Sequence, residues 1–237
     1  MPRRSAFTHS AKWYDLLYSF KDYQAAAAQL HAVIQTANPG ARSLLDVACG
    51  TGRHLEHLRQ WYEVEGVDLN GQFLRASRKR LPGIVLHHGD MTHFDLGRRF
   101  DVVTCLFSSI GYLQTVKHLR SAFRSFARHV VPGGLLVVEP WLSPDQYWLK
   151  KVTLNTVQHE GTTIAWMYTS KRSGRRSIFD IHFLVGTASG VEHFVETHAM
   201  GLFTPREYTE ALRRAGFDWR HDPKGLFGRG MYTAVLR

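Results

Sequence analysis

The chain has 237 residues, of which 44% are hydrophobic, and it carries a formal net charge of +10 at pH 7. This length and composition fit one well-packed globular domain and exclude a fibrous, low-complexity or disordered protein. No apolar run approaches the roughly 18 residues of a membrane span, and no apolar segment follows the arginines near the N-terminus. We therefore expect neither a membrane partner nor a secretory signal.

The excess of basic residues favours an acidic partner, such as a phosphorylated small molecule or a nucleic acid. The basic residues are scattered, however, and their densest clusters, at 75–80 and 170–176, contain no aromatic side chains for stacking on bases. We interpret both clusters as solvated surface, and a nucleic acid is not the partner that we expect.

The two cysteines, Cys49 and Cys105, lie in apolar segments that are typical of strands. They are too few for a disulfide framework and lack the spacing of a metal motif, so we expect both to be reduced and buried and the protein to be cytoplasmic. Fourteen histidines are present, but they do not form a set with recognisable ligand spacing. No metal site is predicted.

The first 40 residues are predicted to be helical. Trp13, Leu16 and Leu17 recur at helical spacing, and an alanine-rich amphipathic segment follows from 23 to 34. Asn-Pro-Gly at 38–40 ends this second helix.

Between 41 and 140, short apolar segments alternate with amphipathic helical ones, which predicts right-handed βαβ units and a parallel sheet. The strands are almost continuously apolar, which indicates a sheet that is covered on both faces. The predicted strands of this part are 43–49, 64–69, 84–90, 100–107 and 135–140.

The pattern changes after Trp141. Strand-like segments joined by Gly-containing turns predict an antiparallel meander within 141–200. A helix from Thr204 to Gly216 follows, with Thr204 as its cap and Pro205 at its first position, and a last strand covers 231–237. No linker is long enough to separate independent domains. The meander strands are predicted at 152–158, 162–170, 177–185 and 191–203.

The segment LLDVACGTG, from Leu44 to Gly52, ends a strand and begins a helix. Gly50 and Gly52 allow the backbone to pass close to a ligand, and ligands of open α/β sheets bind beyond the carboxyl ends of the strands. Leu55 stands where the third glycine of a nicotinamide-binding fingerprint would be, and an acidic residue, Asp46, lies inside the strand. The loop therefore predicts a cofactor site of another class.

Two further strands end in acidic residues. Asp68 ends the second strand, where a carboxylate can accept hydrogen bonds from both hydroxyls of a ribose, each contributing about 1.5–3 kcal/mol; the alternative is a helix cap. Asp90 and Met91 end the third strand. An acceptor beside an apolar side chain suits adenine, and the alternative is a loop aspartate next to a core methionine.

With LHHGDM at 86–91 and FSSIGYL at 107–113, these motifs resemble those of class I S-adenosylmethionine-dependent methyltransferases. More specifically, the chain resembles the N,N-dimethyltransferases that act on amino groups of dTDP-linked deoxysugars in macrolide biosynthesis. The resemblance also covers YDLLYSFKDY at 14–23, VVEPW at 137–141, LFT at 202–204 and GRGMY at 228–232.

The resemblance implies an α/β, Rossmann-like fold with a mostly parallel seven-stranded sheet and helices on both faces. Residues 1–40 would form a helical lid, 41–140 and 201–237 the S-adenosylmethionine-binding core, and 141–200 an antiparallel meander that forms the acceptor pocket or an oligomer surface. S-adenosylmethionine is the expected cofactor, S-adenosylhomocysteine the product, and a homodimer the family-level expectation.

The resemblance also implies that Tyr14 and Tyr23 approach the methionine part of the cofactor, a tyrosine ring being suited to a sulfonium. The segment 106–108 would lie beneath the cofactor. The full set expected to bind it is Tyr14, Tyr23, Asp46, Ala48, Gly50, Gly52, Asp68, Leu69, Asp90, Met91, Phe107 and Ser108.

Tyr112 is the candidate catalytic residue, because it follows the fourth strand where the methyl group would emerge. Its phenol can orient an amine, and we expect no dedicated strong base. Glu139 either binds the substrate ammonium or caps a loop, and Arg229, in a Gly-Arg-Gly turn, suits a pyrophosphate. The candidate substrate-binding residues are Phe7, Glu139, Trp141 and Arg229.

The sequence thus predicts N-methylation of the amino group of a dTDP-linked aminodeoxysugar, to the dimethylamine. One alternative is methylation of another small amine or hydroxyl in specialised metabolism. Two further alternatives are an enzyme that methylates an RNA base and a regulator that binds the cofactor without catalytic activity.

Overall fold

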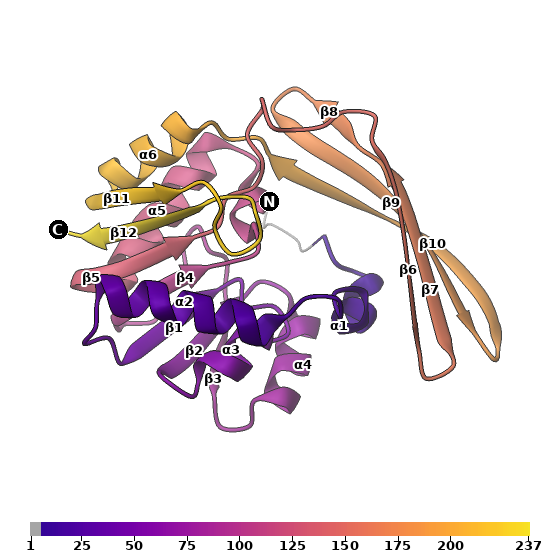
Figure 1. Cartoon of the computed structure of the whole chain (residues 1–237), viewed down its shortest axis with the longest axis horizontal. Helices are drawn as coiled ribbons and strands as arrows, with labels where there is room; N and C mark the ends of the chain where they lie inside the picture. Colours follow the sequence, from indigo (N-terminus) through magenta and orange to yellow (C-terminus); the bar gives the residue numbers. More distant parts are fainter. Residues whose placement is uncertain (1–5) are drawn as a thin grey trace.

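Two β-sheets of different construction form the protein, and the computed structural model describes them within residues 6–237 (Figure 1). The helical elements are η1 (Ser10–Trp13), α1 (Tyr14–Leu17), α2 (Tyr23–Ala37), α3 (Arg53–Leu58), α4 (Gly71–Arg80), η2 (Ser109–Leu113), α5 (Val116–His129) and α6 (Pro205–Arg214). The strands are β1 (Ser43–Val47), β2 (Glu63–Asp68), β3 (Val85–His88), β4 (Phe100–Cys105), β5 (Val130–Val138), β6 (Val152–His159), β7 (Thr162–Thr169), β8 (Lys171–Ser173), β9 (Arg176–Thr187), β10 (Gly190–Gly201), β11 (Phe217–Asp222) and β12 (Met231–Leu236).

The larger sheet has seven strands in the order β11-β12-β5-β4-β1-β2-β3. Strands β1 to β5 pair in parallel, while β12 pairs antiparallel with both β5 and β11. The prediction of a mostly parallel seven-stranded sheet is confirmed. The sequence pattern did not locate β11, because this edge strand buries only its first residue, Phe217, and is otherwise charged or half-exposed.

Helices cover both faces of this sheet, and each face has its own apolar core. Helices α2, α3 and α4 pack on one face through residues such as Leu30, Leu55 and Leu74. Helices α5 and α6 pack on the other face through residues such as Phe123 and Leu212. The continuously apolar strands between them are explained by this double burial.

The N-terminal region, predicted as one lid, divides into two parts. Helix α2 belongs to the core of the large sheet, whereas η1 and α1 lie between the large sheet and the second sheet (Figure 1). Leu17 of α1 packs on Ile164 and Phe183 of the second sheet. Only the segment that precedes α2 is therefore placed to cover a site between the sheets.

The second sheet is the predicted antiparallel meander. Its strands lie in the order β10-β9-β7-β6, and the short strand β8, which the pattern did not separate from β7, pairs with β9. Alternate residues face the core, so that Glu196 and His198 of β10 are buried while Val195 and Thr197 are exposed. Within residues 6–237 we find no helix with the length and apolar character of a membrane span.

Gly66, in the middle of β2, has no room for a methyl group. A Cβ atom there would lie 2.7 Å from Cys49 Sγ and 2.9 Å from Leu55 Cδ1. We expect Gly66→Ala to lower the free energy of unfolding by about 1–3 kcal/mol, because the packed neighbours must move. Urea denaturation measures this. Gly40→Ala is the control, since its Cβ would have no atom closer than 3.9 Å; equal losses in both variants would contradict the prediction.

Candidate active site

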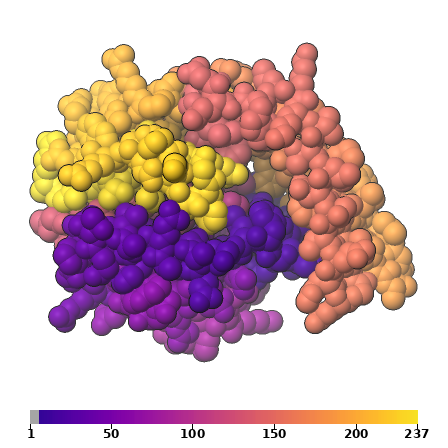
Figure 2. Space-filling view, viewed as in Figure 1, coloured from indigo at the N-terminus to yellow at the C-terminus, as the bar shows by residue number. Residues whose placement is uncertain are grey.

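A cavity of about 1010 Å³ lies between the carboxyl ends of the parallel strands and the inner face of the second sheet. In Figure 2 the second sheet stands off the core as a wall, with a hollow between them. Ligand pockets are typically about 300–1,000 Å³. The cavity is therefore large enough for a cofactor and a second small molecule side by side.

At one end of the cavity, the loop that follows β1, residues 48–52 (the β1 loop), lies next to Asp68. Ala48 and Gly50 line the cavity with positive φ angles of 60° and 58°. The backbone N–H groups of Gly50 and Asn70 donate to the two carboxylate oxygens of Asp68, at 2.8 and 2.7 Å. These bonds fix the carboxylate, 8% exposed, at the cavity wall, where its remaining lone pairs suit the two hydroxyls of a ribose.

The end of β3 lies next to it. Asp90 and Met91 line the cavity together with Leu69 and Gly89. Asp90 also accepts hydrogen bonds from the N–H and hydroxyl of Thr92, at 2.9 and 2.8 Å, which hold its turn in place. The structure thus brings Asp90 and Met91 to the cavity wall, and their role at an adenine stays a prediction.

The loop after β4 forms the floor of the cavity in a strained conformation. Phe107 and Ser108 have φ angles of 51° and 59°, values that non-glycine residues rarely adopt outside functional sites. Glu139 accepts the N–H of Phe107 at 2.7 Å, and Ser108 Oγ donates to the carbonyl of Pro140 at 2.7 Å. Phe107 lines the cavity, whereas Ser108 and Glu139 lie outside its lining and support it. Of the two roles considered for Glu139, the structure shows the loop cap.

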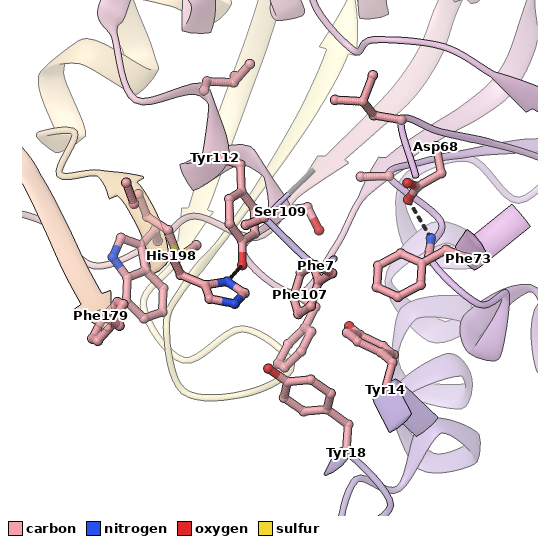
Figure 3. Close-up of a pocket in the computed structure, with 18 of the residues that line it drawn as sticks. Phe7, Tyr14, Tyr18, Asp68, Phe73, Phe107, Ser109, Tyr112, Phe179 and His198 are labelled. Atoms are coloured by element: carbon pink, nitrogen blue, oxygen red, sulfur yellow. Dashed lines mark hydrogen bonds between the residues drawn. The ribbon is translucent and has the colours of Figure 1, made fainter. Parts of the chain in front are cut away.

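Tyr14 covers the cofactor end of the cavity, and Phe7, a candidate substrate-binding residue, lies between this end and Tyr112 (Figure 3). The ring of Tyr14 packs on those of Phe7 and Phe73, with centroids 5.2 and 4.7 Å away. The next residue, Asp15, accepts the hydroxyl of Thr51 at 2.6 Å and pairs with Arg80, which ties α1 to the β1 loop.

Tyr23, by contrast, packs on His54 behind Lys21 and does not line the cavity. It belongs to the part of the N-terminal region that joins the core. Asp46 and Gly52 are also outside the lining, and they shape the strand and the turn behind it.

The acceptor end combines the η2 segment, the second sheet and the β11–β12 loop. The hydroxyl of Tyr112 lies 2.8 Å from Nδ1 of His198 (Figure 3). Trp141 donates to Ser177 Oγ at 3.0 Å. The guanidinium of Arg229 lies 4.8 Å from the Trp141 ring and donates to Ser108 Oγ. All but the two serines line the cavity.

The sequence interpretation missed several lining residues. Lys21 places its ammonium over the rings of Phe107 and Phe227 and has no hydrogen-bond partner among the described residues. Burial lowers the pKa of Lys21 to about 7 although Glu139 lies nearby. Lys21 lies in the segment YDLLYSFKDY, two residues before the predicted Tyr23, so the sequence could have indicated it as a candidate. The other missed residues include Tyr18, Phe73, Tyr168, Phe179 and His198.

These features fit S-adenosylmethionine. The carboxylate acceptors, the aromatic cover and an unpartnered buried ammonium match the ribose, the sulfonium and the anionic end of such a molecule. Both cysteines are free and buried, as expected. In the part of the chain that is described, we find no cluster of three or more His, Cys, Asp or Glu that could hold a metal ion.

Asp46 is 2% exposed and accepts the hydroxyl of Thr104 at 2.7 Å. Burial raises its pKa to about 7, against the effect of the Thr104 hydrogen bond. Because the folded protein holds this proton more tightly than the unfolded chain, stability falls as the pH rises from about 4 to about 7.

Asparagine cannot ionise, so we expect Asp46→Asn to be more stable than the wild type at pH 8 and to lose that advantage toward pH 5. Urea denaturation across this range measures the difference. Asp95→Asn is the control, because the carboxyl group of Asp95 has a lowered pKa, through the backbone N–H of Gly97, and stays ionised throughout. A pH-independent difference for Asp46→Asn would contradict the assignment.

Residues 44–134 match the family model described as a methyltransferase domain. The chain is 44% identical, over 95% of its length and 90% of the relative's, to dTDP-3-amino-3,6-dideoxy-alpha-D-glucopyranose N,N-dimethyltransferase of Streptomyces fradiae. The crystal structure of Streptomyces venezuelae DesVI matches with a TM-score of 0.92 at 40% identity, covering 98% of this chain and 100% of that one.

The S-adenosylmethionine-bound structure of CalS10, an amino pentose methyltransferase from Micromonospora echinaspora involved in calicheamicin biosynthesis, matches with a TM-score of 0.88 at 37% identity and covers 100% of both chains. Similarity at this level extends over the core, the N-terminal segment and the second sheet. The chain therefore belongs to the class I S-adenosylmethionine-dependent methyltransferases, in the family that contains the dTDP-aminosugar N,N-dimethyltransferases.

Proposed function

We propose that this methyltransferase acts on the amino group of a dTDP-linked aminodeoxysugar and carries it to the dimethylamine. The observation that carries the proposal is the pairing of Tyr112 and Arg229 in the acceptor end of one cavity. A neutral phenol suits an amine, and a half-buried guanidinium suits a pyrophosphate. Relatives named for this class of acceptor resemble the chain over nearly its whole length.

The cofactor end would hold S-adenosylmethionine through Asp68 at the ribose, Asp90 at the adenine and Tyr14 near the sulfonium. Lys21 is the cation available for the methionine carboxylate. When bound, the cofactor supplies an electrophilic methyl group. The β1 loop, Phe107 and the N-terminal segment would exclude water from it.

The acceptor end has to hold a neutral amine on the line of the transferring methyl group. Such positioning can contribute about 7–11 kcal/mol to lowering the barrier, because translational freedom is lost on binding. Burial holds the pKa of Tyr112 well above its ordinary value, so its phenol stays protonated. It would act as a hydrogen-bonding group that orients the amine, while Trp141 and Arg229 would hold the rest of the substrate.

Asp68→Asn should weaken cofactor binding. The amide loses the charge that strengthens hydrogen bonds from ribose hydroxyls, a loss of about 1.5–3 kcal/mol, or about 10- to 100-fold in Kd. Isothermal titration with S-adenosylmethionine measures it. Thermal unfolding is monitored in parallel, because Asp68 also accepts backbone N–H groups. Asp95→Asn, at an exposed position, is the control, and an unchanged Kd for Asp68→Asn would contradict the ribose assignment.

Incubation with S-adenosylmethionine and a dTDP-linked 3-amino-3,6-dideoxyglucose should give products heavier by one and then two methyl groups in mass spectrometry. The same aminosugar without its nucleotide is the control, and it should react more slowly because Arg229 has no pyrophosphate to bind. The proposal fails when no nucleotide-linked aminosugar is methylated by protein that binds the cofactor. If the free aminosugar and the dTDP-linked aminosugar are methylated at equal rates, Arg229 does not bind the pyrophosphate.

A further inference from the structure

Three polar side chains lie in a row at the acceptor end of the cavity, joined by one hydrogen bond, between Tyr112 and His198, and one longer ionic contact, between His198 and Glu196. Glu196 and His198 lie two residues apart on β10, so both face inward, and both are buried, at 4% and 5% exposure. His198 Nε2 lies 3.8 Å from a carboxylate oxygen of Glu196. Its other ring nitrogen, Nδ1, lies 2.8 Å from the hydroxyl of Tyr112, which comes from η2 (Figure 3).

The first member of this row is a firmly ionised carboxylate. One oxygen of Glu196 accepts the backbone N–H groups of Thr8, His9 and Ser10, and the other accepts the hydroxyl of Ser10. Burial alone would raise the pKa of Glu196, but the nearby His198 ring and the hydrogen bonds from Ser10 and Thr8 lower it far below its ordinary range. Glu196 therefore presents a negative charge to His198 at every pH near neutrality.

This charge selects the tautomer of His198. A neutral imidazole carries one proton, and the nearby carboxylate favours that proton on Nε2. Nδ1 is then an acceptor, so the contact with Tyr112 requires the phenol to donate. A phenol oxygen that donates its proton to His198 offers its lone pairs as acceptors, which is the polarity needed to orient an amine N–H.

We propose that Glu196, His198 and Tyr112 form a relay that orients the substrate amine and takes up the proton released by its methylation. The proposal rests on the proposed N-methyltransferase function. Tyr112 would contact the amine, and His198 and Glu196 would be positioning residues that act through it.

In each turnover the amine lone pair forms the new N–C bond while the electron pair of the C–S bond stays on sulfur. The ammonium proton passes to the oxygen of Tyr112 as the phenolic proton passes to Nδ1 of His198. The resulting imidazolium is stabilised by Glu196 and releases its proton to solvent after the product leaves. Each methylation therefore needs no charge on the tyrosine, in agreement with the raised pKa of Tyr112.

The other groups that face the relay are few. The ring of Phe7 packs edge-on against His198 with centroids 4.7 Å apart, and Phe179 is the cross-strand neighbour of His198 on β9. Tyr18 and Arg229 also act electrostatically on Tyr112, and Tyr112 in turn acts on Tyr14. Asp180 of β9 accepts the hydroxyl of Thr197, which points to the opposite face of β10.

The test compares His198→Gln with the control His193→Gln, which changes an exposed histidine of the same strand. Glutamine cannot take up a proton, so we expect the kcat of His198→Gln for the dTDP-aminosugar to fall about 10- to 100-fold, at the low end of typical acid–base contributions. The acidic limb of its kcat–pH profile should change, while the Kd for S-adenosylmethionine and the thermal midpoint stay close to those of the wild type. His193→Gln should match the wild type in all of these measurements.

A double-mutant cycle separates a relay from local packing. Tyr112→Phe should cost about as much as His198→Gln, and the double variant should cost no more than either one, because groups that act as a unit are not additive. Additive losses, or a His198→Gln enzyme with wild-type kcat and pH profile, would overturn the relay while leaving the proposed function intact.

A readout that needs no activity is the tautomer itself. Nitrogen-15 NMR of histidine-labelled protein, with His198→Gln to assign the signal, should show a proton on Nε2 and a bare Nδ1. A proton on Nδ1 would overturn the proposal whatever the enzyme methylates. If the wild-type protein methylates no aminosugar, the proposed function fails, and this tautomer measurement still decides the geometry of the relay.

Discussion

The carboxylate of Glu196 is the constraint on which the site depends. It lies on the second sheet and accepts hydrogen bonds from the backbone of residues 8–10, nearly 190 positions earlier in the chain. Hydrogen bonds to a charged group contribute about 1.5–3 kcal/mol each and cost as much to leave unmade when buried. This one side chain therefore holds the N-terminal segment between the sheets, where Phe7 and Tyr14 close the cavity.

A second set of charges shapes the floor. Glu139 caps the strained loop after β4, and it lies near two half-buried cations, Lys21 and Arg229. Buried charges are tolerated when they are paired or have a ligand, and here the cations outnumber the carboxylate. Burial lowers the pKa of both cations, so an anionic ligand would relieve the cost of their desolvation. The floor is thus suited to the carboxylate of one ligand and the phosphates of another.

Three of the six described non-glycine residues with positive φ angles lie where the parallel strands end. Ala48, after β1, and Phe107 and Ser108, after β4, adopt left-handed conformations that cost about 1–3 kcal/mol each for non-glycine residues. These two strands are neighbours in the sheet and mark its topological switch point, where ligands of such folds bind. This strain lies at the floor of the cavity, and hydrogen bonds from Phe107 and Ser108 to Glu139 and Pro140 maintain it after β4.

The sequence by itself determined the local units: the alternation of strands and helices, the LLDVACGTG turn, and the carboxylates at Asp68 and Asp90. Each of these units depends only on residues that are close together in the chain. The fold class then places the turn and the two carboxylates at the carboxyl ends of parallel strands. The meander was recognisable because its apolar residues alternate.

Only the tertiary structure decided which distant side chains meet. Tyr23 packs on His54, while Lys21, two residues earlier, lines the cavity. The KDY motif marks this segment but does not show which of its side chains enters the cavity. The contact between Tyr112 and His198 joins residues 86 positions apart, one on η2 and the other on the second sheet. This contact forms because the second sheet packs against the core. The sequence shows that His198 occupies a strand position, but its hydrogen-bond partner can be identified only from the packing of the two parts.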